Sequence, residues 1–407
     1  IRDIEKRTKH DVKAGIEAYV IVSGAGEHLH KGMTSRDLTD NVEQMQIRNA
    51  SQILFGKYVS LARHFADKAE AYRDIFLTSR THNQPAQLTS LGRRFSMWGE
   101  ELLGGILGFE RFIDNYALRG IKGPVGTQPD MLTLLGSQDR VEQLERSVMQ
   151  HLGFRRTLDS PGQVYPRSLD FELASQLAIM SAAPENFAKT LRIMAGYELA
   201  TEGFREGQVG SSAMPHKMNT PHSERICGLA NLTKMYADGA SRISGDQWQE
   251  GDVSESVVRR VVIPDTFYAS DGLVETTLNV LNGMGVYPAM IEAEVDRYLP
   301  FLATTEILME AVKAGMGREQ GHAVIKKHAV ATALDMRKGG KNNLVNRLMA
   351  EPEFTDRGID ASIKGVLSER EGFIGNAYAQ IDAVAKRTDE LVSRYKEAAS
   401  YEPQPIL

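Results

Sequence analysis

The chain has 407 residues, a formal net charge of −5 and a single cysteine. Its shares of 42% hydrophobic and 25% charged residues are typical of proteins that fold in water, and the charge gives no electrostatic reason to expect a nucleic-acid partner. No apolar run approaches the length of a membrane span. One cysteine excludes an internal disulfide and is typical of a reducing compartment, so we expect a cytoplasmic protein without a membrane segment.

The first 37 residues combine a charged helical segment with two polar clusters. There is no initiator methionine, and we expect the chain to begin inside its first domain. The histidines are not spaced like zinc ligands, so we expect no metal. Thr34 or Ser35 fits a helix N-cap, with Asp37 near the positive end of the helix dipole. Helix N-termini also bind carboxylates, so this segment is a candidate ligand site.

Apolar residues at helical spacing predict two long helices, at residues 38–74 and 90–116. Helices of this length usually run through a bundle. The stretch between them, residues 79–89, is polar and predicts a loop. It contains Thr81 and His82, and a solvated loop histidine is the ordinary alternative to a catalytic one.

Further helices are predicted over residues 171–204, 221–237 and 265–281, followed by shorter helices in the C-terminal part. A polar loop at 160–170 contains Gln163 and Arg167, and the Arg side chain suits a carboxylate or phosphate. Glycines and a proline interrupt the helical pattern at 282–288. We therefore predict an N-terminal domain at 1–37, a central bundle at 38–283 and a C-terminal helical domain at 284–407.

The loop at residues 207–221 is the richest in chemistry. It contains two adjacent serines, Ser211 and Ser212, together with Lys217 and Asn219. Such groups can take up a proton and stabilise an anion. A polar surface connection remains the alternative, because loops are polar in general.

Several segments resemble one enzyme superfamily. The run GSSAMPHKMN at 210–219 is similar to the GSSxMPxKxN loop of the fumarase/aspartase superfamily, and its His points to the adenylosuccinate lyase branch or the related 3-carboxymuconate cycloisomerases. HKGMTSRD at 30–37 resembles HxGxTSxD, and THNQPAQLT at 81–89 resembles THxQPAxPT. The stretch at 248–260 resembles WxERDxSxSxxxR, with Gly251 where an Arg is common, and residues 160–167 match TQxxxR only partly.

The resemblance covers nearly the whole chain and implies an all-α fold, in which a long central helical bundle is flanked by two smaller helical domains. It implies a homotetramer with active sites shared by three chains. The implied reaction is cleavage of adenylosuccinate to AMP and fumarate, and of SAICAR to AICAR and fumarate, by β-elimination without a metal or cofactor. The alternatives are 3-carboxy-cis,cis-muconate cycloisomerase, argininosuccinate lyase or an inactive structural relative.

The resemblance also assigns roles to individual residues. His82 is expected to be the general acid and Ser211 the general base. Gly251 leaves one cationic contact with the substrate unassigned. The expected substrate-binding residues are His10, Asp11, His30, Thr34, Ser35, Asp37, Thr81, Gln163, Arg167, Ser212, Met214, Lys217, Asn219, Glu224, Ser256 and Arg260.

Overall fold

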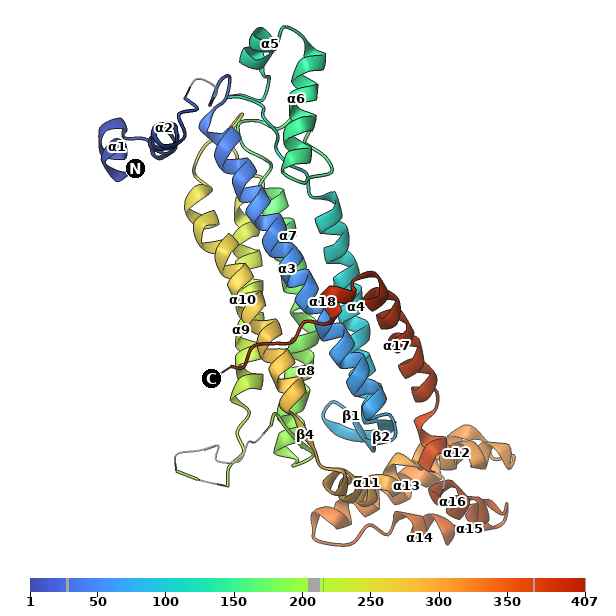
Figure 1. Cartoon of the computed structure of the whole chain (residues 1–407). Coiled ribbons are helices and arrows are strands. Elements are labelled where there is room, and N and C mark those ends of the chain that lie inside the picture. Colours follow the sequence, from blue (N-terminus) through green and yellow to red (C-terminus); the bar gives the residue numbers. More distant parts are fainter. Residues whose placement is uncertain (27–28, 204–212, 215, 369, 407) are drawn as a thin grey trace.

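A computed structural model describes residues 1–26, 29–203, 213–214, 216–368 and 370–406 of the chain. Six of the described helices run along the long axis of the molecule and form a bundle (Figure 1). The longest of them, α3, has 37 residues and is about 55 Å long. The predicted all-α class is confirmed, since the described strands are few and short. The bundle helices are α3 (Ser35–Ala71), α4 (Leu91–Asn115), α7 (Ser168–Met180), α8 (Ala182–Gly196), α9 (Pro221–Ile243) and α10 (Ser256–Gly283).

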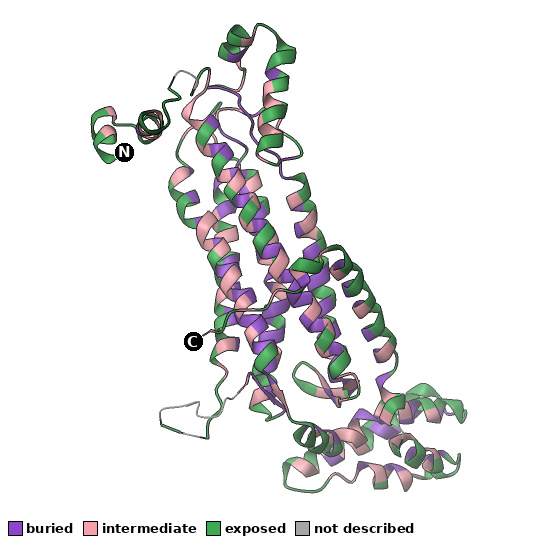
Figure 2. Ribbon diagram, viewed as in Figure 1, coloured by how far each residue is buried: buried purple, intermediate pink, exposed green. Residues whose placement is uncertain are grey.

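Aromatic side chains fill one part of the bundle core. Phe65 of α3, Phe95 and Trp98 of α4 and Phe187 of α8 lie with ring centroids between 5.1 and 6.4 Å apart. Burying one such side chain contributes about 1.5–3 kcal/mol relative to leaving it exposed. Buried residues follow the inner faces of the bundle helices (Figure 2), so this core fixes how the helix ends are placed.

The single helix predicted over residues 171–204 is wrong. The structure has two helices there, α7 and α8, which meet at Ser181, and α8 ends at Gly196. Pro184 lies in the first turn of α8, where its missing N–H costs no intrahelical hydrogen bond. Helices exist at both positions predicted at 221–237 and 265–281, and both are longer than predicted. They are α9, which ends at Ile243, and α10, which runs from Ser256 to Gly283.

The polar loop predicted at residues 79–89 is also wrong, because most of it belongs to an antiparallel hairpin. Strand β1 (Phe76–Thr81) pairs with β2 (Gln84–Ser90). Leu77 and Leu88 are buried and anchor the two strands. The polar composition hid the strands from sequence inspection, since only these few positions face a core.

Small helices cover the two ends of the bundle (Figure 1). At the end where α3 and α10 begin lie α1 (Arg2–Thr8), α2 (Asp11–Ser23), α5 (Pro129–Leu135) and α6 (Gln138–His151). At the other end, β3 (Ala200–Thr201) pairs with β4 (Gly285–Val286). Beyond this pair follow α11 (Pro288–Leu302), α12 (Thr304–Lys313), α13 (Arg318–Arg337), α14 (Leu344–Met349), α15 (Pro352–Thr355), α16 (Ile359–Ser368) and the 3₁₀ helix η1 (Arg370–Ile374).

The last two helices return to the bundle. Both α17 (Ala377–Arg394) and α18 (Lys396–Ala399) pack on α3, and α17 also packs on α4. Helices α12 to α16 have a separate core that includes Ile307, Leu344 and Phe354. Residues after 284 thus contribute to the bundle core, to this separate core and to a small cluster that includes Leu88 of β2, and the predicted domain boundaries stay a prediction. None of the described helices is both long and apolar enough to cross a membrane.

Candidate active site

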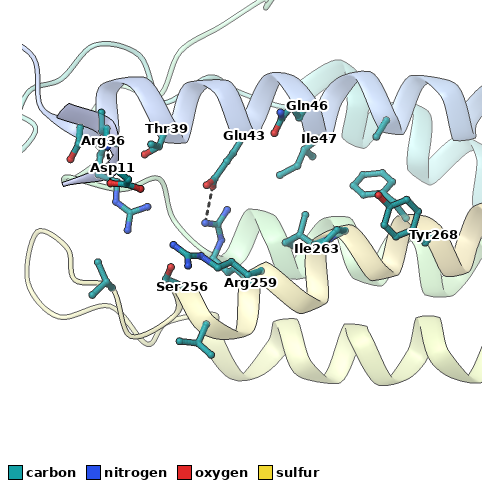
Figure 3. A pocket seen from close by; sticks show the side chains of 18 of the residues that line it. Asp11, Arg36, Thr39, Glu43, Gln46, Ile47, Ser256, Arg259, Ile263 and Tyr268 are labelled. Atoms are coloured by element: carbon teal, nitrogen blue, oxygen red, sulfur yellow. Dashed lines mark hydrogen bonds and ion pairs between the residues drawn. The ribbon is translucent and has the colours of Figure 1, made fainter. Parts of the chain in front are cut away.

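An open cavity of about 920 Å³ lies where α2, α3 and α10 begin. Figure 3 shows it between α3 and α10, with Arg36 and Glu43 on one wall and Ser256 and Arg259 on the other. Five residues that the sequence singled out line this cavity, from three separate segments of the chain. They are His10, Asp11, Ser35, Ser256 and Arg260.

Three helix N-termini converge on the cavity. His10 is the N-cap of α2, and its Nδ1 accepts a hydrogen bond from the backbone N–H of Lys13 at 3.3 Å. Ser35 is the first residue of α3 and Ser256 the first residue of α10. Helix N-termini carry partial positive charge and unpaired N–H groups, so the cavity suits an anionic ligand.

The neighbouring arginines Arg259 and Arg260 are placed differently. The Arg259 guanidinium is buried, donating to Asp170 at 2.6 Å and to Glu43 at 2.9 Å. Burial by itself lowers the pKa of Arg259, but interactions with Tyr165, Asp170 and Glu43 outweigh burial. The pKa therefore lies above its usual value, and Arg259 stays charged. Arg260 is exposed and makes no ion pair among the described contacts. The guanidinium that is available to a ligand is therefore that of Arg260.

Gln163 and Arg167 lie behind the cavity and do not line it. Arg167 is 2% exposed and donates to Glu255 Oε1 at 3.0 Å, with its guanidinium over the Tyr165 ring. Its Nε and Nη1 have no hydrogen-bond partner in the described part of the chain. The backbone N–H of Gln163 donates to the carbonyl of Glu250 at 2.6 Å.

Asp37 is buried at the start of α3 and is held by donors from its own chain, and its predicted contact with the substrate stays a prediction. Its carboxylate is 3% exposed and accepts hydrogen bonds from Arg119 and from the backbone N–H groups of Thr34, Lys122 and Gly123. These donors occupy the acceptor sites of both oxygens. Asp37 therefore fixes the start of α3 and, with it, the neighbouring Thr34 and Ser35.

His30 lies near this end of the bundle, in a turn before α3, and does not line the cavity. Its φ of 63° is left-handed, and its carbonyl accepts a hydrogen bond from the N–H of Met33. Of the residues that do line the cavity, Arg36, Thr39 and Glu43 were missed by sequence inspection. Helical spacing is the signal that could have found them, because Thr39 lies four residues after Ser35, three after Arg36 and four before Glu43, and residues three or four apart share one helix face.

The remaining predicted residues that the structure describes lie at the opposite end of the bundle (Figure 1). Thr81 ends β1, and His82 occupies the exposed turn of the hairpin. Lys217 is exposed shortly before α9, and its backbone N–H donates to the carbonyl of Met214. Asn219 and Glu224 are exposed nearby, before and within the first turn of α9. Ser211 and Ser212 lie outside the described residues.

One chain therefore does not bring the predicted residues into a single site. Those at the cavity and those at the hairpin are separated by much of the length of α3, which is about 55 Å. Among the described residues, no group of three or more His, Cys, Asp or Glu side chains is placed to hold a metal ion.

Comparisons with known proteins identify the family. The family model described as "Lyase" matches residues 1–231, and "Adenylosuccinate lyase C-terminus" matches residues 300–384. The adenylosuccinate lyase of Saccharomyces cerevisiae is 34% identical over 94% of this chain and 80% of its own length. That of Schizosaccharomyces pombe is 33% identical over 98% of this chain and 83% of its own length.

Solved structures support the fold. The 3-carboxy-cis,cis-muconate lactonizing enzyme from Pseudomonas putida aligns with a TM-score of 0.82 over 96% of this chain and 85% of that one, at 17% identity. A fumarate lyase from Mesorhizobium sp. BNC1 aligns with a TM-score of 0.79 over 95% and 84%, at 18% identity. At such low identities these matches concern the fold alone. From its family models and near-full-length relatives, the chain belongs to the adenylosuccinate lyase family of the fumarase/aspartase superfamily.

Proposed function

We propose that this protein is an enzyme that cleaves adenylosuccinate to AMP and fumarate, and SAICAR to AICAR and fumarate, in purine biosynthesis. The observation that carries the proposal is the similarity to adenylosuccinate lyases over 94–98% of the chain, together with the match of residues 300–384 to the C-terminus of that family. The alternatives are not favoured, because the curated relatives at 33–34% identity and the C-terminal family model are all adenylosuccinate lyases. The solved muconate enzymes resemble this chain at only 17–19% identity.

The cavity is suited to the anionic groups of such a substrate. Adenylosuccinate carries a phosphate and two carboxylates. Three helix N-termini and the exposed Arg260 meet at the cavity, and each favours bound negative charge. We assign Ser35, Ser256 and Arg260 to binding of these groups.

The reaction requires a base and an acid. The base removes a proton from the carbon next to a carboxylate, the C–N bond breaks, and the leaving nitrogen takes a proton as the fumarate double bond forms. We assign the base to Ser211 and the acid to His82, since an imidazole can donate a proton near neutral pH. Lys217 and Asn219 would stabilise the charge that develops on the carboxylate.

The distribution of these residues supports an oligomer. His82 and Arg260 lie at opposite ends of the bundle, so they can act on one substrate only if different chains supply them. Exposed apolar side chains of the bundle helices, including Ile53, Met235 and Val261, are suited to burial against other copies of the chain. We propose a homotetramer in which three chains contribute to each site.

The proposed partners are small-molecule purine nucleotides, with no nucleic acid, and the proposed location is the cytoplasm. The net charge of −5 and the single cysteine support these two assignments.

The deciding experiment is a fumarate-release assay. Purified protein is mixed with adenylosuccinate, and the ultraviolet absorbance change is followed. We expect turnover within the ordinary range of about 1–10³ s⁻¹. If folded protein releases no fumarate while it converts 3-carboxymuconate or argininosuccinate, the proposed substrate is wrong.

A further inference from the structure

The turn that carries His82 has an unfavourable backbone conformation. His82 and Asn83 both have positive φ values, 51° and 57°, and Thr81 pairs with Gln84 across the turn. These features are those of a two-residue type I′ turn, in which glycine is preferred at the second central position. Neither central residue here is glycine. Non-glycine residues in left-handed conformations persist when the surrounding structure holds them in place.

Arg80 stabilises this turn through a hydrogen bond to its backbone. It lies two residues before His82 on β1, and its Nη1 donates a hydrogen bond to the carbonyl of Asn83 at 3.2 Å. The guanidinium is 4.4 Å from the centroid of the Tyr197 ring, on the segment after α8, and 5.8 Å from that of Tyr298 on α11. Contacts with two aromatic rings and a carboxylate restrict the guanidinium, so the carbonyl of the turn accepts from a donor that is itself held in place.

Glu294 of α11 completes this arrangement. Its Oε1 accepts a hydrogen bond from Arg80 Nη2, and the two side chains are only 10% and 13% exposed. Burial lowers the pKa of the nearby Arg94 to about 10, and the negative charge of Glu294 opposes this shift. Arg94 donates to the carbonyl of Thr78 on β1 at 3.3 Å. Two arginines thus contact carbonyl groups of the hairpin, and Arg80 is the one paired with Glu294.

The register of the hairpin shifts by one residue between Thr78 and Arg80, and the extra residue belongs to β2. The Ser79 hydroxyl donates to the Gln87 carbonyl at 2.6 Å and accepts from the Gln87 N–H at 3.2 Å, which joins the two strands at this irregularity. Side-chain as well as backbone hydrogen bonds therefore connect the turn to the rest of the hairpin.

We propose that the Arg80–Glu294 ion pair is a positioning device that holds the His82 turn in its catalytic geometry and couples this turn to the C-terminal helices. Arg80 and Glu294 are positioning residues, which act through the turn and do not touch the substrate. This inference rests on the proposed role of His82 as the general acid.

The test compares Arg80→Lys and Glu294→Gln with a control, Thr305→Val. Lysine keeps the positive charge at position 80 but cannot bond to both Glu294 and the turn in the fork geometry. Thr305 Oγ1 accepts a hydrogen bond from Gln87 Nε2 at 3.0 Å, which links the hairpin to α12 without reaching the turn. We expect kcat of Arg80→Lys to fall at least about tenfold with KM changed less than threefold, the pattern of a defect in the chemical step. Thr305→Val should leave both values within twofold of the original.

The double variant Arg80→Lys/Glu294→Gln should be about as slow as the slower single variant, because both changes disrupt one interaction. Multiplying effects in the double variant, or a loss of kcat in Thr305→Val equal to that in Arg80→Lys, would overturn the proposal.

Hydrogen exchange measured by mass spectrometry tests the same idea independently of activity. Peptides covering residues 78–90 should exchange at least about threefold faster in Arg80→Lys than in the original protein, while peptides from the middle of α3 and α4 stay unchanged. Unchanged exchange at the hairpin would overturn the proposal whatever the substrate is. Faster exchange in a protein that releases no fumarate would instead contradict only the proposed function.

Discussion

His82 and Arg260, the proposed general acid and a proposed substrate-binding residue, lie in different surroundings. Arg260 is exposed beside a cavity, whereas Arg259 next to it is buried and paired with Asp170 and Glu43. His82 lies on the exposed turn of the hairpin and does not line that cavity. The side chains of adjacent helix residues point in different directions. Arg259 therefore has a structural role, whereas the guanidinium of Arg260 is available to a ligand.

Replacement of His82 by Asn tests the general acid. Asparagine tolerates the left-handed backbone of the turn, so the hairpin should be preserved while the titrating ring is lost. We expect kcat to fall by about 10²–10⁴-fold, the usual contribution of general acid–base catalysis. Ser211→Ala should reduce kcat to a similar extent. Steady-state fumarate release measures both effects, and an unchanged melting temperature serves as the control.

Full activity of His82→Asn would remove His82 from the acid role. In that case another group must protonate the leaving nitrogen.

At the scale of elements, the crossing of α3 and α4 leaves no space at Gly92. A Cβ added there would lie 2.2 Å from the carbonyl oxygen of Ala69 and 2.7 Å from the Cα of Arg73. Backbone atoms cannot move aside as a flexible side chain would. The close approach also allows the Gly92 N–H to donate to the carbonyl of Tyr72 at 2.8 Å, which joins the end of α3 to the start of α4.

Gly92→Ala is therefore expected to destabilise the protein by about 1–3 kcal/mol or more, as overpacking of a core does. The matched control is Gly365→Ala in α16, where an added Cβ meets nothing within 4 Å and alanine favours the helix by roughly 0.5–1 kcal/mol. Chemical denaturation measures both. Equal stability of the two variants would contradict the close α3–α4 approach.

The attachment of α17 to α4 predicts a dependence of stability on pH. Burial by itself raises the pKa of Glu110, but hydrogen bonds from Tyr395 and Arg394 outweigh it and lower the pKa below its usual value. A carboxyl whose pKa is lowered by folding adds stability above its unfolded pKa of about 4.3. This contribution is lost as the pH falls through the folded pKa.

Glu110→Gln should consequently lower stability at pH 7 by up to about 1 kcal/mol, the usual worth of a partly exposed pair. The difference from the original protein should shrink as the pH falls from about 5 to below the folded pKa. Melting temperatures at several pH values measure it. A difference that grows towards low pH would contradict the assigned interaction.

At the scale of the whole molecule, the bundle separates two sets of predicted active-site residues. The cavity with Arg260 lies at one end, and His82 with Lys217 lies at the other (Figure 1). Helix α3 runs between them as one uninterrupted helix of 37 residues, so the two sets lie far apart within a single chain. Assembly of several chains removes the difficulty, because antiparallel packing of bundles places opposite ends side by side.

A mixing experiment tests this arrangement. His82→Asn and Arg260→Gln are each expected to be nearly inactive when pure. If the two residues of a site come from different chains, random reassembly of an equal mixture should restore about one quarter of the original activity. Separate reassembly of each variant is the control. No recovery, in mixtures shown to exchange subunits, would mean that one chain supplies both residues.

The sequence by itself determined the class of fold and the candidate residues. Long apolar periodicity predicts α3 and α4 within three residues of their observed ends, because helical spacing is a local property. The motifs around Ser35, His82 and Arg260 singled out residues whose chemistry suits the proposed reaction. None of this depends on contacts between distant parts of the chain.

Only the tertiary structure decided how those residues are used. It showed that Asp37 is occupied by Arg119 and backbone donors, that the polar stretch around His82 is a hairpin, and that Arg80 of this hairpin is paired with Glu294, 214 residues further along the chain. Each of these findings depends on which side chains from distant parts of the chain contact one another and which of them become buried. Local sequence patterns carry no such information, since burial and pairing arise only when separate elements pack together.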